Sequence, residues 1–171
     1  MTGKNHLIFG GLCGGLVLYH EYVGGVPIVP TAVAVGTCVL GNLLPDIDVP
    51  TSVIGKLLKP FSILFQKIFG HRTFFHSLLA LAFLYVGMWY WSMQTGSPYI
   101  MAARFGIVVG YVGHLFLDMF TSRGIPLAWP FSKKCYSLLD RRSGGKFETA
   151  LTILLFLGVV GFYCGYQRFF G

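Results

Sequence analysis

The chain has 171 residues, enough for one domain with a core but not for two independent ones. Hydrophobic residues make up 54% and charged residues only 11%, whereas an average soluble domain has about 25% charged residues. This composition excludes an ordinary soluble protein and indicates a single integral-membrane domain over residues 1–171. The net charge of +7 is therefore interpreted as a topology signal and an attraction to anionic lipid headgroups, and no direct binding of nucleic acid is expected.

Five stretches of the chain are apolar over the length of about 20 residues that a membrane-spanning helix needs. They lie at 6–23, 27–44, 73–93, 99–120 and 148–168. The first is the weakest, because His20 and Glu21 shorten its apolar run and four glycines lower its helix propensity. It lacks a convincing signal-peptide cleavage site, so it is treated as a membrane segment. We therefore expect an all-α fold, a polytopic bundle of about five transmembrane helices.

Residues 45–72 connect the second and third predicted spans and contain three prolines, which prevent one continuous helix. Within them, the stretch VIGKLLKPFSILFQKIF mixes lysine with leucine, isoleucine and phenylalanine. That mixture favours a short segment lying in the membrane interface, with the lysines reaching the headgroups. An ordinary cytoplasmic loop is the alternative. Residues 121–147 combine glycine and proline turn signals with a basic cluster and predict a second surface loop.

Lysine and arginine give the expected orientation. With five spans, the N-terminus and the loops at 45–72 and 121–147 share one side, which carries eleven of the 13 basic residues. Only Arg104 and Arg168 fall on the other side. Because cytoplasmic loops are enriched in Lys and Arg, we expect this side and the N-terminus to be cytoplasmic.

The histidines and acids collect on the same side, although the spans were located from apolarity alone. His20 and Glu21 are the exceptions on the opposite side, and Asp140 lies in the basic loop, where a surface ion pair is expected. The candidate site residues near the predicted cytoplasmic surface are His6, Asp46, Asp48, His71, His76, His114, Asp118 and Glu148.

His114 and Asp118 are four residues apart, which places both side chains on one helical face, within reach of one ion. Ionisable groups inside a membrane usually mark a functional site; a simple hydrogen bond between the two is the alternative. Asp46 and Asp48 flank Ile47 and could bracket a cation, although such a pair can also belong to a turn or a helix cap.

Arg72 and His76 are also four residues apart, so we expect them to share one helical face. His71 and His76 do not share a face, so we expect His71 to act from the loop. The planar guanidinium of Arg72 is suited to a phosphate oxygen. Its position is equally compatible with a basic anchor at the cytoplasmic surface.

Neutral imidazoles together with carboxylates fit a divalent ion, most readily Zn²⁺, with Mn²⁺ or Fe²⁺ as alternatives. Several carboxylates favour more than one ion, between one and three in total. Two close metals could activate water and stabilise both oxygens of an in-line displacement at phosphorus. A zinc site built from cysteine is not expected, because the four cysteines form no CxxC pair.

The motifs closely resemble those of the bacterial family described as LexA-binding, inner-membrane-associated metal-dependent hydrolases. The resemblance rests on His6, LLPDIDVPTS (43–52), GHRTFFHSLL (70–79), GYVGHLFLDMFTSRGIPLAWPF (110–131) and Glu148 in GGKFE. It implies a hydrolase of the bacterial inner membrane. The implied motif residues are His6, Asp46, Asp48, His71, His76, His114 and Asp118, with Glu148 added.

The family is distantly similar to the zinc-dependent phospholipase C and single-strand nuclease superfamily, in which a His-x-x-x-Asp pair on a helix binds zinc. His114 and Asp118 match that pair. The chain departs from the family pattern at Val49, where members often have histidine, and at Thr73 and Phe75. The number of metals is therefore not carried over, and a fold-level likeness identifies no substrate.

The leading hypothesis is a metal-dependent hydrolase acting on a phosphoester of a lipid or lipid-linked substrate at the cytoplasmic interface. Asp46, Asp48 or Glu148 would serve as general base and Arg72 would hold a phosphate oxygen. The expected partners are membrane lipids and an anionic or phosphorylated substrate.

Two alternatives have different functions. One is a non-catalytic membrane interaction protein with a structural metal, which docks a soluble regulatory protein on its basic loops. The other is a cation transporter, since intramembrane acids and histidines can form an ion pathway. The transporter is disfavoured because the polar groups gather at one surface and none lies at mid-span.

Overall fold

A computed structural model describes residues 1–23, 25, 27–70, 72–139 and 145–170. His71, a predicted metal ligand, lies outside the described residues. Over the described part of the chain, the elements are helices joined by turns, with one isolated antiparallel bridge between Ile125 and Tyr136. The predicted all-α membrane bundle is confirmed.

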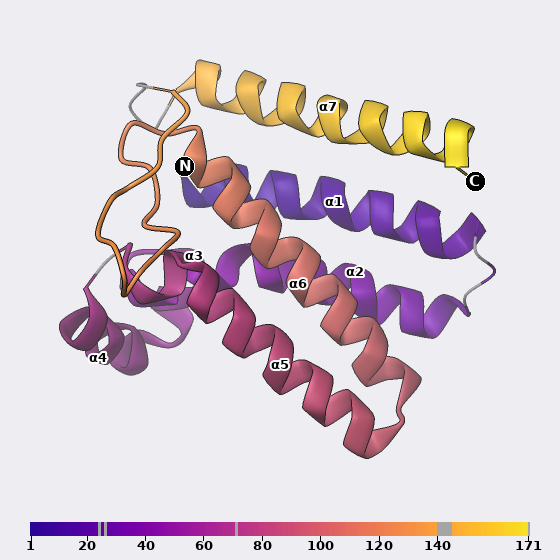
Figure 1. Cartoon of the computed structure of the whole chain (residues 1–171), viewed down its shortest axis with the longest axis horizontal. Coiled ribbons are helices and arrows are strands. Elements are labelled where there is room, and N and C mark those ends of the chain that lie inside the picture. The colour runs from indigo at the N-terminus through magenta and orange to yellow at the C-terminus, as the bar shows by residue number, and fades with distance from the viewer. Residues whose placement is uncertain (24, 26, 71, 140–144, 171) are drawn as a thin grey trace.

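Each of the five predicted apolar stretches coincides with a long helix (Figure 1). These helices are α1 (Gly3–Val23), α2 (Ile28–Leu43), α5 (Leu78–Thr95), α6 (Pro98–Met119) and α7 (Lys146–Phe170). Within the described residues, three segments are both long and apolar enough to cross a membrane: Val29–Asp48, Pro98–Met119 and Lys146–Gly165. A crossing by all five helices stays a prediction.

The N-terminus, the end of α6 and the start of α7 lie at one end of the bundle, and the C-terminus lies at the other (Figure 1). Four short helices occupy the same end as the N-terminus. They are the 3₁₀ helix η1 (Leu44–Asp48), α3 (Val53–Leu57), α4 (Lys59–Phe69) and the 3₁₀ helix η2 (Phe74–His76).

Helices α2 and α6 form the centre of the bundle and touch through their backbones. A Cβ atom on Gly110 of α6 would collide with the carbonyl oxygen of Cys38, and one on Gly41 of α2 would collide with the carbonyl oxygen of Ile107. Small residues of this kind allow two membrane helices to approach closely. The contact brings the C-terminal end of α2 beside the last turns of α6.

The third long helix begins later than the apolar run predicts. Ser77 caps α5 by accepting a hydrogen bond from the Ala80 amide at 3.3 Å, so the helix starts at Leu78 instead of residue 73. Arg72 precedes the helix and has a φ of 56°. The predicted shared helical face of Arg72 and His76 is therefore wrong, because α5 begins after both residues.

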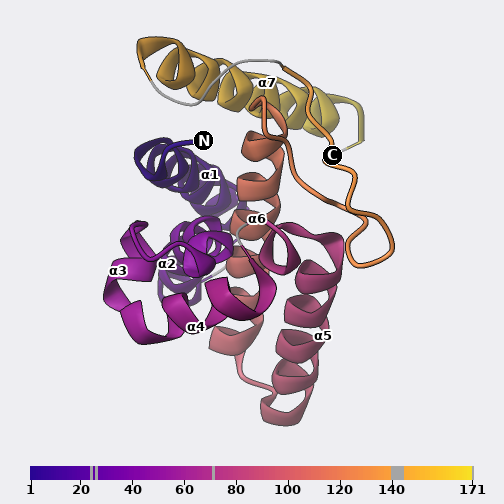
Figure 2. The ribbon, with the colours of Figure 1, turned by 90° about the vertical axis from the view of Figure 1, so that its left-hand side faces the viewer.

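The predicted interfacial segment folds as α3 and α4, which lie across one end of the bundle (Figure 2). Ser62 of α4 is buried, whereas Phe61, Leu64 and Ile68 on another face of the same helix are exposed. This two-faced helix is compatible with the membrane interface; its position in the interface stays a prediction.

Candidate metal centre

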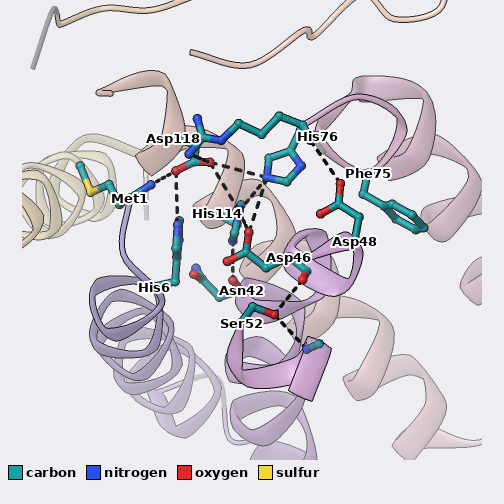
Figure 3. A network of polar contacts seen from close by, with 12 residues as sticks. Met1, His6, Asn42, Asp46, Asp48, Ser52, Phe75, His76, His114 and Asp118 are labelled. Carbon is teal, nitrogen blue, oxygen red and sulfur yellow. Dashed lines mark hydrogen bonds and ion pairs between the residues drawn. The ribbon is translucent and has the colours of Figure 1, made fainter. Parts of the chain in front are cut away.

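Five of the predicted ligands come together at the N-terminal end of the bundle (Figure 3). They are His6 from α1, Asp46 from η1, His76 from η2, and His114 and Asp118 from α6. Four of these side chains are fully buried, and Asp46 is partly exposed. The structure therefore assembles residues that are more than 100 positions apart in the sequence.

The five side chains form two overlapping groups, in each of which the ligand atoms lie within 4.8 Å of one another. One group is His6, His114 and Asp118, and the other is Asp46, His76 and His114. The Nε2 atom of His114 lies 3.3 Å from Nε2 of His76 and 3.9 Å from Oδ1 of Asp46. Ligand atoms around one tetrahedral zinc are about 3.4 Å apart, given bonds of about 2.0–2.1 Å. The donors thus fit a divalent ion with small adjustments, and His114 belongs to both groups.

The orientation of His114 is fixed from α2. Its Nδ1 lies 2.7 Å from the carbonyl oxygen of Asn42. Because a carbonyl only accepts, Nδ1 carries the proton and donates, which leaves the lone pair of Nε2 directed into the cluster. His6 stacks on the same ring, with ring centroids 3.7 Å apart and planes within 10°.

Asp118 receives several contacts from donors. His6 Nε2 lies 3.3 Å from Oδ1 of Asp118, His76 Nε2 lies 3.6 Å from Oδ2, and Arg72 Nη2 lies 2.9 Å from Oδ2. The amino group of Met1 also forms an ion pair with this carboxylate. Such partners are what a buried carboxylate requires, because an unpaired buried charge is strongly destabilising.

Asp48 was predicted as a ligand but belongs to neither group among the described residues. Its Oδ2 accepts a hydrogen bond from the backbone N–H of Arg72 at 3.2 Å, and Figure 3 shows its carboxylate apart from the cluster. That bond supports Arg72 in a backbone conformation that is uncommon outside glycine. Asp48 therefore positions Arg72, which in turn contacts Asp118.

Arg72 is held on two further sides. Its Nη1 donates to the carbonyl oxygen of Gly124 at 3.0 Å and to the hydroxyl of Thr121 at 3.3 Å. Both terminal nitrogens of the guanidinium thus have protein partners. Arg72 therefore connects the loop after α6 to Asp118 of the cluster.

Glu148 also lies outside both groups. It is buried at the start of α7, and its Oε1 accepts a hydrogen bond from the backbone N–H of Thr2. The carboxylate therefore joins α7 to the N-terminal segment that contains Met1 and His6. Its predicted catalytic role stays a prediction.

The sequence reasoning missed Asn42, Thr121 and Gly124. Thr121 and Gly124 carry no residue-type signal for their contacts with Arg72. Asn42 did carry one, because a buried amide inside a predicted apolar span is costly. Its side chain is fully buried, and both of its polar atoms lack a hydrogen-bond partner among the described residues.

A cavity of about 810 Å³ opens beside the cluster. It is lined by Met1, Thr2, Gly3, Asp46, Val49, Thr51, Ser52, Val53, Arg72, Ser122 and Arg123. Asp46 is the only acid among these residues, so the cluster is reached through a mainly polar and basic opening.

Comparison with known proteins gives one family. The model of the family described as YdjM inner membrane protein matches residues 1–168. The inner membrane protein YdjM of Escherichia coli strain K12 is 35% identical over 164 residues, which cover 92% of this chain and 80% of the relative. The protein YvsG of Bacillus subtilis strain 168 is 32% identical over 171 residues, which cover 100% of this chain and 98% of the relative. No solved structure matches the chain.

Proposed function

The chain belongs to the YdjM inner membrane protein family, and on that basis together with the buried cluster we propose that it is a metal-dependent hydrolase of the bacterial inner membrane. The observation that carries the proposal is the convergence of three imidazoles and two carboxylates on overlapping ligand groups that share His114. Three imidazoles and two carboxylates at this spacing are the donor types that divalent metal ions bind in proteins. The resemblance to LexA-binding membrane hydrolases supports the same activity.

Zn²⁺ is the proposed ion, with Mn²⁺ or Fe²⁺ as alternatives, because imidazole and carboxylate donors suit these metals. His6, His76, His114, Asp46 and Asp118 would hold one or two ions. When bound, the metal supplies Lewis acidity toward water and a phosphoryl oxygen. The likeness to the zinc-dependent phospholipase C and nuclease superfamily supports this chemistry by analogy.

Asp46 is the best placed of the three predicted general bases. It is the one that lines the cavity, where water has access. Asp48 accepts from the Arg72 amide and Glu148 from the Thr2 amide. Asp46 is therefore the proposed acceptor of the proton from the attacking water, through the carboxylate oxygen that does not bind the ion.

The proposed substrate is a phosphoester of a lipid or lipid-linked molecule at the cytoplasmic surface. The excess of Lys and Arg near the site supports a cytoplasmic position for the cluster and the N-terminus. The same charges would attract an anionic substrate from the lipid surface.

A second candidate function is non-catalytic docking of a soluble regulatory protein, with the metal serving structure. It is favoured by the side chain of Phe131, which is 93% exposed beside Lys133 and Lys134. Exposed aromatic residues are enriched at protein-binding surfaces, and the two lysines would favour an acidic partner.

One experiment separates the two functions. Detergent-purified protein is stripped with a chelator, reloaded with zinc, and assayed on a generic phosphoester and on lipid phosphates. A hydrolase loses turnover on stripping and regains it with zinc, and His114→Ala abolishes it while His20→Ala, at the other end of α1, does not. Metal-loaded protein that hydrolyses none of these esters would contradict the hydrolase.

A further inference from the structure

Arg123 is a basic residue of the cavity that neither the motifs nor the ligand groups include. It is exposed, lies in the loop after α6, and lines the same cavity as Asp46. The structure gives it no ion pair or hydrogen bond through its side chain among the described residues. A guanidinium stays charged at any physiological pH and presents a planar set of donors. Arg123 thus offers an uncommitted positive charge at the entrance to the cluster.

Arg72 lines the same cavity but, unlike Arg123, its side chain contacts other protein groups. Its Nη2 contacts Asp118, and its Nη1 donates to Gly124 and Thr121. Three of its five N–H groups are thus directed at protein partners, and its Nε, which has no hydrogen-bond partner among the described residues, is buried away from the cavity. The guanidinium of Arg72 is thus mostly enclosed by the protein, whereas that of Arg123 is exposed, so Arg123 is better suited to the expected phosphate-holding role.

Neutral donors accompany Arg123 around the cavity. The hydroxyls of Thr51 and Ser122 form no hydrogen bond in the described part of the chain and line the opening. Ser52 differs, because its hydroxyl donates to the Asp46 carbonyl at 2.8 Å and accepts from the Gly55 amide at 2.9 Å. One free guanidinium and two free hydroxyls match an anion with several acceptor oxygens.

We propose that this cavity is a phosphate-binding site in which Arg123 is the charged recognition residue and Thr51 and Ser122 are neutral donors. The proposal rests on the proposed function in one respect, namely that the ester bond to be cleaved lies beside Asp46. A volume of about 810 Å³ lies within the roughly 300–1,000 Å³ of small-molecule sites. It leaves room for a phosphate and the group esterified to it.

The test measures binding of inorganic phosphate by calorimetry to zinc-loaded protein in detergent, with metal content determined on each sample. Arg123→Gln is expected to weaken phosphate binding about tenfold, since a charge-assisted hydrogen bond is lost. Arg123→Lys keeps the charge without the planar donors, so its phosphate affinity should lie between those of the wild type and Arg123→Gln. Lys133→Gln removes a charge from the same loop outside the cavity lining and should change the affinity less than about twofold.

Two further arms distinguish the source of the phosphate. One uses soluble glycerol 3-phosphate, and the other uses phosphatidylcholine vesicles containing phosphatidic acid with protein reconstituted in them. Loss of binding by Arg123→Gln in the vesicle arm alone identifies a lipid headgroup. Loss in the soluble arm as well identifies a phosphate recognised independently of the membrane.

The outcomes separate this inference from the hydrolase. Phosphate binding that depends on Arg123 without any hydrolysis would support the binding site and contradict the activity. Hydrolysis that Arg123→Gln leaves at the wild-type kcat/KM would support the activity and overturn the site. Metal-loaded protein that binds neither inorganic phosphate, nor glycerol 3-phosphate, nor vesicles containing phosphatidic acid would overturn the site as well.

Discussion

The imidazole of His114 donates from Nδ1 to the backbone carbonyl of Asn42 at 2.7 Å, so the last turn of α2 orients a side chain of α6. This relationship makes the cluster depend on the packing of two helices as well as on its ligands. It also fixes which nitrogen of His114 faces His76 and the two carboxylates.

His114→Ala should remove metal more completely than loss of either partner histidine. His114 belongs to both ligand groups, whereas His6 and His76 each belong to one. We expect bound zinc, measured by mass spectrometry of purified protein, to vanish in His114→Ala and to fall by part in His6→Ala and His76→Ala. His20→Ala, at the far end of α1, should retain the wild-type content. Equal losses in all three cluster variants would argue for a single site.

Gly110→Ala should disturb the packing of α2 against α6 without replacing a predicted metal ligand. The added Cβ would collide with the carbonyl oxygen of Cys38 and lie 2.7 Å from the backbone nitrogen of Asn42. Overpacking of this kind costs about 1–3 kcal/mol, or roughly 2–4 °C of Tm per kcal/mol in a chain of this size. Thermal unfolding in detergent and zinc content should both fall. Gly87→Ala is the matched control, because no atom lies within 4 Å of its added Cβ.

Asp46 and Asp48 should separate into a ligand and a positioning residue. Asp46→Asn removes a carboxylate that is within reach of His76 and His114, so zinc should be lost. Asp48→Asn weakens the hydrogen bond that Asp48 accepts from the backbone N–H of Arg72. Zinc affinity should fall about 10–100-fold, as it does when a residue that orients a metal ligand is replaced. Competition with a fluorescent zinc chelator measures both affinities. A larger loss of zinc affinity in Asp48→Asn than in Asp46→Asn would reverse these assignments.

The sequence predicted the parts of this structure that depend on local geometry. His114 and Asp118 needed only the helix period to share a face, and the apolar lengths were enough to locate five helices. The start of α5 was missed because the apolar run continues through Phe74 and Phe75. These residues instead form a 3₁₀ turn, whose Phe75 carbonyl accepts from Tyr111 of α6.

The remaining errors have a common cause in tertiary contact. Arg72 does not share a helical face with His76, because its backbone is held outside α5 by the distant Asp48. Asn42 and Gly124 act through backbone carbonyls, which every residue type possesses. No spacing rule identifies which carbonyl will face a histidine or an arginine.

The exposed face of α4 should lie in the membrane interface. Leu64→Cys, made with Cys135 and Cys164 replaced by serine, can carry an environment-sensitive fluorophore. We expect blue-shifted emission in vesicles and quenching by spin-labelled lipids, because Leu64 lies between exposed Phe61 and Ile68. Lys133→Cys in the exposed loop is the comparison and should emit as in water. Water-like emission from position 64 would exclude this placement.

α7 should cross the bilayer from the side of the metal centre. Its 25 residues, Lys146–Phe170, span about 37 Å at 1.5 Å per residue, which exceeds the roughly 30 Å hydrocarbon core. Alkaline phosphatase fused after residue 171 should therefore be active, whereas green fluorescent protein at the same place should stay dark. The opposite pattern would place the C-terminus in the cytoplasm and contradict a crossing from a cytoplasmic cluster.

Under the proposed hydrolysis, the polar cavity beside Asp46 would decide where each product goes. In hydrolysis of a lipid phosphoester at this site, water would arrive through an opening lined by Arg72, Arg123 and hydroxyl groups. The released phosphate, once freed from its anchor, is soluble and would diffuse away by the same opening, while the apolar product stays in the bilayer. The two products would thus separate by solubility at the moment of cleavage, and recombination would be suppressed by their partition into different solvents.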